Sequence, residues 1–364
     1  MNPIRVLQIV PAMNCGGMEN FIMNVYRNID RQKVQFDFLY HYDMDCFFDK
    51  EIEKLGGKTY KLTVRQDNNF PKYFKNLDDF FKEHTEYKVV HGHYSGFGMF
   101  YNHYAKKHGV ATRAGHSHNA FHESNLTGYA DGILSTTFKY NLTDRFACSE
   151  KAGDFLFGKK PFEVIKNGID IKRFAFDEKK RAEARRELEI KDELVIGHIG
   201  RFSQAKNHTF IVDIFNEIVK SKPASILLLA GEGELMAGTK KKAEEYGIGE
   251  KVKFLGVRRD TDRLLCAMDA FLYPSIFEGL PVSCIEAQTS GVPCFFSDNI
   301  TSEVQICDKT VFFSLDKSPT LWAESLLKSE AGDRTIGALD AVKAGYDIVE
   351  STKRLQNFYI EKSV

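Results

Sequence analysis

Two glutamates, Glu278 and Glu286, have the spacing in this sequence that points most directly to chemistry. Seven residues separate them, and Gly279 and Leu280 lead from the first toward Pro281. If a helix begins near Pro281, Glu286 lies about one turn into it and faces back toward the loop. The backbone N–H groups of Gly279 and Leu280 can then bind phosphate at the helix mouth, while the two carboxylates accept hydrogen bonds from hydroxyl groups.

The structural alternative for this pair is a helix-capping acid and a solvent-exposed glutamate. Glu286 lies in the otherwise apolar stretch VSCIEA, where an unpaired acid is costly. We therefore favour a functional pair, which suits a nucleotide sugar: one carboxylate for the ribose and one for the sugar.

Two cations follow a second predicted strand, residues 194–200. Arg201 and Lys206 lie five positions apart across a loop and helix start, directly after Gly200. Arginine offers forked donors and lysine a point charge, so together they can bind a diphosphate. The alternative is an unrelated pair of surface cations.

Adjacent glycines, Gly16 and Gly17, follow the first predicted strand, 4–10. They allow close approach of the backbone to a ligand, and the helix that follows offers free N–H groups to a phosphate. A tight turn that requires glycine explains them equally well. The pattern is not GxGxxG, which disfavours a nicotinamide cofactor.

Histidines gather at the ends of two further predicted strands, in the pairs His91 and His93, and His116 and His118. Polar strand ends explain them most simply, although His122 follows soon after. The pairs lack the cysteines or the HExxH context of a zinc site, so we predict no metal site. Nor does any lysine stand out as a pyridoxal Schiff base, and we expect no organic cofactor.

Short apolar runs alternate with helix-length amphipathic stretches along the whole chain. Continuous apolar runs suit strands buried on both faces, and this alternation is typical of βαβ units. A turn at 167–170 and a charged helix at 177–190 separate two series, which predicts an α/β fold with two Rossmann-like, doubly wound parallel sheets. The predicted strands are 4–10, 36–40, 88–91, 110–116, 145–149 and 162–166, then 194–200, 225–230, 252–255, 270–273, 293–297 and 310–314.

Composition excludes several classes of protein. The chain has 364 residues, with 50 Lys+Arg and 50 Asp+Glu. Nucleic-acid binders usually carry a basic excess, so we expect no nucleic-acid partner. The seven cysteines form no CxxC pair, and the first apolar run is too short for a signal peptide or membrane span, so we expect a cytoplasmic protein with reduced thiols.

These motifs together resemble the retaining glycosyltransferases of family GT4, which have the GT-B fold of two domains facing across a cleft. The resemblance covers about 15 to 290, in family order, and is strongest to members that build capsules and exopolysaccharides. The matching elements are GGME at 16–19, VIKNGID at 164–170 followed by Phe174, GR-x4-KN at 200–207, AGEG at 230–233 and E-x7-E at 278–286.

The resemblance implies a role for each site residue. Arg201 and Lys206 would hold the donor diphosphate and stabilise the leaving nucleotide, and Gly16 and Gly17 would approach it from the other domain. Glu286 would bind the ribose, and Glu278 with Gly279 and Leu280 the transferred sugar. A histidine at the end of an N-domain strand would contact that sugar: His116, with His118 as the second candidate.

It also implies a domain organisation. Residues 1–170 would form the acceptor-side domain, completed by a crossover helix at about 345–364, and 171–344 would bind the donor. The expected donor is a UDP-sugar. The expected acceptor is a lipid-linked glycan at the cytoplasmic face of a membrane, where the protein would bind peripherally.

Two other functions stay open from the sequence. One is a different enzyme on the same fold, such as a sugar-nucleotide epimerase or a phosphorylase. The other is a non-catalytic subunit that keeps the donor site, because the binding and catalytic residues of this fold are nearly the same set.

Overall fold

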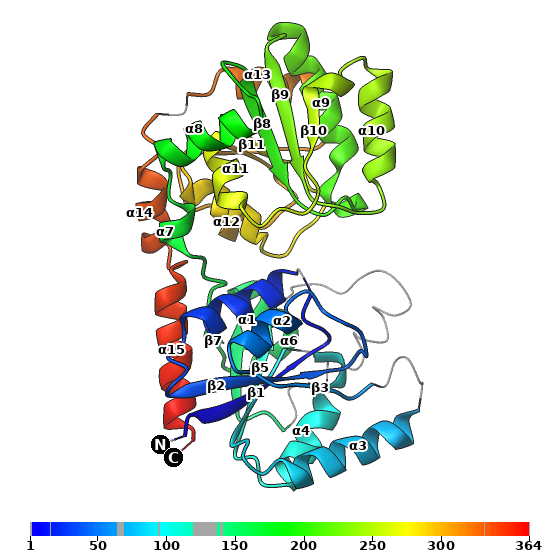
Figure 1. Cartoon of the computed structure of the whole chain (residues 1–364), viewed down its shortest axis with the longest axis vertical. Helices are drawn as coiled ribbons and strands as arrows, with labels where there is room; N and C mark the ends of the chain where they lie inside the picture. Colours follow the sequence, from blue (N-terminus) through cyan, green and yellow to red (C-terminus); the bar gives the residue numbers. More distant parts are fainter. Residues whose placement is uncertain are drawn as a thin grey trace. The chain divides into compact units, whose positions relative to one another are not determined.

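The computed structural model describes the chain in two compact units (Figure 1). Unit 1 comprises 1–168 and 348–364, and unit 2 comprises 169–347. The sequence placed these boundaries at 170/171 and 344/345. The described residues are 2–14, 16–63, 69–93, 95–118, 137–138, 141–330 and 332–363.

Unit 1 is built on a seven-stranded sheet of order β3-β2-β1-β4-β5-β6-β7, and every neighbouring pair is parallel. Successive residues of β1 enter different cores: Val6 and Val10 pack on one face, Leu7 and Ile9 on the other. The sheet is therefore covered on both faces, as the continuous apolar runs predict. Its strands are β1 (Ile4–Val10), β2 (Val34–Tyr40), β3 (Thr59–Lys61), β4 (Val89–Gly92), β5 (Thr112–Ser117), β6 (Asp144–Ala147) and β7 (Glu163–Val164).

The helices of unit 1 supply these two cores. Helices α1, α2 and α15 contribute to the core that contains Val6, and α3, α4 and α6 to the one that contains Leu7. The bounds are α1 (Gly17–Asn28), α2 (Asp49–Lys54), α3 (Phe70–Glu83), α4 (Gly98–Lys107), α6 (Glu150–Phe157) and α15 (Ile348–Glu361).

Unit 2 repeats the plan with six parallel strands of order β10-β9-β8-β11-β12-β13. One core receives α7, α11, α12 and α14, the other α9, α10 and α13. The strands are β8 (Leu194–Ile199), β9 (Ser225–Ala230), β10 (Val252–Phe254), β11 (Ala270–Tyr273), β12 (Cys294–Ser297) and β13 (Thr310–Phe313). The helices are α7 (Ile171–Phe174), α8 (Glu178–Glu187), α9 (His208–Ser221), α10 (Met236–Glu245), α11 (Thr261–Ala267), α12 (Val282–Thr289), α13 (Pro319–Leu327) and α14 (Ile336–Lys343).

All twelve predicted strands are present within a few residues of their predicted bounds, and α8 confirms the charged helix. One strand, β3, was not predicted. The helix expected at about 345–364 is present as α15, and a turn at 344–347, where Gly345 has φ +77°, separates it from α14. Within the described residues, no helix is long and apolar enough to cross a bilayer.

Candidate functional site

The E-x7-E and GR-x4-KN motifs leave the same edge of the unit 2 sheet. Strands β8 and β11 are paired, and their carboxyl ends lead into the two loops. The strand order reverses between β8 and β11, which is where open α/β sheets bind their ligands. The Ile276 N–H donates to the Ala205 carbonyl at 2.8 Å, which holds the loops together.

Lys206 and Glu278 form the centre of this site. Lys206 Nζ lies 2.6 Å from Glu278 Oε1, and each side chain is only 17% exposed. Lys206 also donates to the Tyr273 hydroxyl and lies 4.8 Å from the centroid of that ring. The sequence paired Lys206 with Arg201 and did not single out Tyr273, whose position as the last residue of β11 was the available signal.

Arg201 does not join this pair. Its guanidinium contacts Glu234 at 3.3 Å, and its side chain is 74% exposed. Exposed ion pairs contribute little stability, so this arginine can exchange its partner for a phosphate at small cost. The backbone beside it is constrained, because a Cβ on Gly231 would lie 2.0 Å from the Gly200 carbonyl oxygen. The AGEG motif therefore packs against the GR motif.

Glu286 lies in the second turn of α12, which begins after Pro281 as predicted. The helix has no side-chain cap, so the N–H groups of its first turn stay available to an anion. Burial raises the pKa of Glu286 to about 8, although the charge of Arg173 opposes the shift. At neutral pH its carboxyl is largely protonated and can both donate to and accept from a hydroxyl.

Gly279 and Leu280 lie where the sequence placed them, directly before Pro281 and the start of α12. Both are partly exposed. Of the predicted unit 2 residues, the structure thus joins Lys206 to Glu278, places Glu286 and the two loop residues on the same helix and its entry, and leaves Arg201 pointing to Glu234.

In unit 1, Gly16 is the N-cap of α1 and Gly17 its first residue, again without a side-chain cap. A Cβ on Gly16 would lie 2.2 Å from Glu19 Oε2, so the Glu19 carboxyl occupies the space a larger residue would need. Burial raises the pKa of Glu19 to about 6. Glu19 is part of the GGME motif, but the sequence predicts no role for it.

The histidines are closer together than strand ends alone would require. His93 hydrogen-bonds His118 at 2.8 Å and Gln8 at 2.8 Å, and His91 hydrogen-bonds the Tyr359 hydroxyl at 2.6 Å. Burial lowers the pKa of all four far enough that the imidazoles are neutral: His91, His93, His116 and His118. His122 lies outside the described residues.

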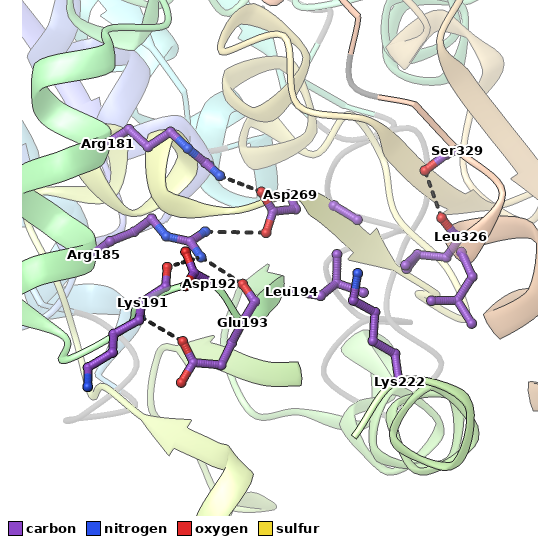
Figure 2. A pocket seen from close by; sticks show the side chains of 12 residues that line it. Arg181, Arg185, Lys191, Asp192, Glu193, Leu194, Lys222, Asp269, Leu326 and Ser329 are labelled. Atoms are coloured by element: carbon purple, nitrogen blue, oxygen red, sulfur yellow. Dashed lines mark hydrogen bonds and ion pairs between the residues drawn. The ribbon is translucent and has the colours of Figure 1, made fainter. Parts of the chain in front are cut away.

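A pocket at the opposite edge of unit 2 contains none of the predicted site residues (Figure 2). It lies at the amino ends of β8 and β11. Arg181 and Arg185 line it, and both bind Asp269 together with backbone carbonyls. These arginines therefore hold α8 to the strand starts.

The two doubly wound sheets, with charged loops at the switch point of unit 2, have the architecture of the GT-B fold. The family described as "Glycosyl transferases group 1" matches residues 180–333. EpsF of Bacillus subtilis (strain 168), whose name describes it as a glycosyltransferase, is 33% identical, with 98% of this chain and 96% of EpsF covered. The chain belongs to the group 1 glycosyltransferases.

Other similar proteins are also glycosyltransferases or have the same fold. The capsular polysaccharide biosynthesis glycosyltransferase CapH of Staphylococcus aureus is 27% identical over 99% of this chain and 100% of CapH. The UDP-Gal:alpha-D-GlcNAc-diphosphoundecaprenol alpha-1,3-galactosyltransferase of Escherichia coli is 24% identical over 83% of each chain. Anabaena HepE, solved in complex with UDP, has the same fold, with a TM-score of 0.78 at 17% identity over 99% of this chain and 100% of HepE. The resemblance seen in the motifs is thereby confirmed.

Proposed function

We propose that this glycosyltransferase moves a sugar from a UDP-sugar to a lipid-linked glycan during capsular or exopolysaccharide synthesis, with retention of the anomeric configuration. The observation that carries the proposal is the Lys206–Glu278 pair at the switch point of unit 2. In the proposal, Lys206 is the cation for a phosphate, and Glu278, 2.6 Å away, accepts hydrogen bonds from the sugar hydroxyls.

Each donor group then has a partner. Lys206 and Arg201 bind the diphosphate, and Lys206 stabilises the charge that develops on the leaving nucleotide. Glu278, with the backbone of Gly279 and Leu280, holds the sugar, and Glu286 binds the ribose diol. Because these cations supply the positive charge, the proposed transfer needs neither a metal nor an organic cofactor.

Unit 1 supplies the remaining contacts in this proposal. Gly16 and Gly17 at the uncapped start of α1 approach the diphosphate. Of the two histidine candidates, His118 is partly exposed whereas His116 is 1% exposed, so we assign the sugar contact to His118. The leaving phosphate itself takes the acceptor proton in a front-face reaction, which requires no second in-line carboxylate.

The relatives support the finer parts of the proposal. The name of the Escherichia coli relative specifies a UDP-sugar donor and a diphosphoundecaprenol-linked acceptor, and that of CapH specifies capsular polysaccharide. Such an acceptor lies in a membrane, so we propose that the protein works as a peripheral protein at the cytoplasmic face.

The test is to incubate the purified protein with a panel of nucleotide sugars and a diphosphoundecaprenol-linked acceptor, and to measure nucleotide diphosphate release and product. Release coupled to transfer supports the proposal. An epimerised donor without release indicates a sugar-nucleotide-modifying enzyme, and tight donor binding with no turnover indicates a non-catalytic subunit.

Lys206→Ala should lower turnover by about two orders of magnitude or more, because the leaving group loses its cation. Lys242→Ala is the matched control: Lys242 forms an ion pair with Asp213 at the same 2.6 Å and similar exposure, away from both motifs. The control should keep normal turnover. Equal turnover in both variants would remove the role assigned to Lys206.

A further inference from the structure

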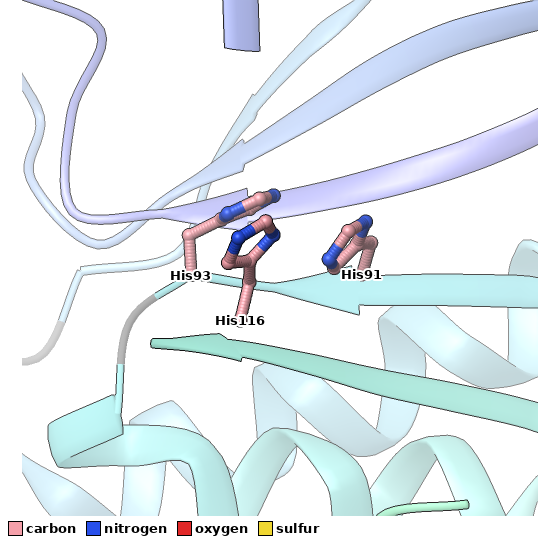
Figure 3. Close-up of side chains that lie close together, drawn as sticks. All are labelled: His91, His93 and His116. Atoms are coloured by element: carbon pink, nitrogen blue, oxygen red, sulfur yellow. The ribbon is translucent and has the colours of Figure 1, made fainter. Parts of the chain in front are cut away.

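Three buried histidines bring ring nitrogens together inside unit 1 (Figure 3). His91 and His93 come from β4 and the residue after it, and His116 comes from the neighbouring strand β5. One nitrogen from each ring lies within 4.8 Å of the others. All three side chains are buried, at 0%, 8% and 1% exposed.

The hydrogen-bond partners of this group are incomplete. Both ring nitrogens of His116 and Nε2 of His91 are buried without a hydrogen-bond partner among the described residues. A buried polar atom that finds no partner is costly, because it loses its hydrogen bonds to water. Simple core histidines normally have at least one nitrogen satisfied, so His116 points to a ligand.

Anchoring contacts fix the rings that do have partners. The Tyr359 hydroxyl bonds His91 at Nδ1, and Nε2 of the same ring has no partner among the described residues. Gln8 Oε1 bonds His93 at Nε2, and His118 bonds it at Nδ1. Histidines that ligate metals usually have the other nitrogen held in this way. Binding an ion requires His93 to exchange one of its two hydrogen bonds.

We propose that His91, His93 and His116 bind one divalent transition-metal ion of the zinc class. Three neutral imidazoles suit zinc and its neighbours, whereas magnesium and calcium require oxygen ligands. The ion ties β4 to β5, and Tyr359 extends this link to α15. The sequence discounted such a site because its HxH pairs lack cysteines; pairing of the two strands supplies the third ligand.

None of the three proposed metal ligands has a role in the proposed sugar transfer. The ion uses His116 as a ligand, whereas the proposed sugar contact belongs to His118, which follows the same strand. The inference stands independently of the proposed function, because it is tested by metal binding without any sugar.

The experiment uses the full-length protein, treated with EDTA and dialysed, then titrated with Co²⁺ while the visible spectrum is recorded, and finally with Zn²⁺. We expect visible absorption that saturates at one Co²⁺ per chain and is abolished by one equivalent of Zn²⁺. His116→Gln should weaken binding by about tenfold or more, whereas His103→Gln, an exposed histidine on α4, should bind as the wild type does.

Circular dichroism shows which variants fold, and if His116→Gln fails to fold, His91→Gln takes its place. Absence of one-to-one binding in the wild type overturns the proposal whatever the variants do. Equal affinity in the wild type and in a folded His116→Gln or His91→Gln variant also overturns it.

Discussion

Lys206 and Glu278 form an ion pair that joins the proposed diphosphate contact to the proposed sugar contact. Their ion pair is mostly buried and is reinforced by the Tyr273 hydroxyl. Breaking one partner of such a pair leaves the other charge poorly solvated. A substitution at either position should therefore also destabilise the charge of the other residue. A double-mutant cycle on the free energy of unfolding should then show strong coupling between the two positions.

Glu286 should make the stability of unit 2 depend on pH. Its pKa rises from 4.5 to about 8 on folding, so the folded state holds the proton more tightly than the unfolded state. The contribution is fully present below pH 4.5 and is lost as the pH rises through about 8. Glu286→Gln removes this loss, so its melting temperature should exceed that of the wild type at pH 9 by on the order of 5 °C.

Thermal melts from pH 5 to 9 measure this effect. Glu324→Gln, an exposed acid on α13, should follow the wild-type curve throughout. Parallel curves for the wild type and Glu286→Gln would show that the Glu286 carboxyl is not desolvated.

Arg334 precedes α14 and connects it to the ends of α11 and α12. Its buried guanidinium donates to the carbonyls of Leu265, Cys266 and Met268 at the end of α11, and to that of Ser290 after α12. Helix carbonyls at a C-terminus have no partner within the helix and favour a cation. Burial lowers the pKa of Arg334 to about 10, which leaves it charged at neutral pH.

Arg334→Met should destabilise unit 2 by about 3 kcal/mol, because the buried carbonyls of Leu265 and Ser290 lose the guanidinium donor, whereas those of Cys266 and Met268 still accept from Arg181. Urea denaturation measures the change, and Lys343→Met on the exposed face of α14 is the control. A loss below about 1 kcal/mol would mean that water or neighbouring side chains satisfy these carbonyls.

The elements that the sequence revealed are those with a local signal. Twelve strands are apolar runs, and α12 begins at a proline. β3 was missed because Thr59–Lys61 is three residues long and mostly exposed, so it carries no apolar run. The chain turns between α14 and α15 because Tyr346 and Asp347 pair with Ile169, a contact between distant residues that no local pattern signals.

Contacts between side chains that are far apart in the sequence could not be predicted, because they leave no local pattern. The motifs identified Lys206, Glu278 and Glu286 together, and the structure confirms the local geometry of the α12 start. Nothing in the sequence links Gln8 or Tyr359 to His93 and His91, because those contacts join residues 85 and 268 positions apart. The pairing of β1 with β4 brings Gln8 near His93, and the packing of α15 against the sheet brings Tyr359 to His91.

At the scale of the whole molecule, the chain passes between the units twice, at 168/169 and at 347/348. Within each unit, a hydrogen bond joins the two segments that lie next to these crossing points. In unit 1 the Ser351 hydroxyl donates to the Lys166 carbonyl at 3.2 Å, and in unit 2 the Ile169 N–H donates to the Tyr346 carbonyl at 2.8 Å. Unit 1 therefore depends on a helix supplied by the far end of the chain.

Gly168 tests this dependence. A Cβ there would lie 2.7 Å from the Ile348 Cα and 2.9 Å from its backbone nitrogen, and backbone atoms cannot rotate away as a side chain can. Gly168→Ala should push the start of α15 outward, which disturbs the packing of Ile348, Leu355 and Tyr359 against the unit 1 core. Such overpacking costs about 1–3 kcal/mol.

Calorimetry should show the unit 1 transition of Gly168→Ala shifted down by several degrees, with that of unit 2 unchanged. Gly238→Ala is the control, because a Cβ at Gly238 in α10 meets nothing within 4 Å, and alanine in a helix should stabilise by about 0.5–1 kcal/mol. If Gly168→Ala melts at the wild-type temperature, α15 tolerates displacement and unit 1 does not depend on its close seating. If both transitions fall together, the two units unfold as one cooperative body rather than separately.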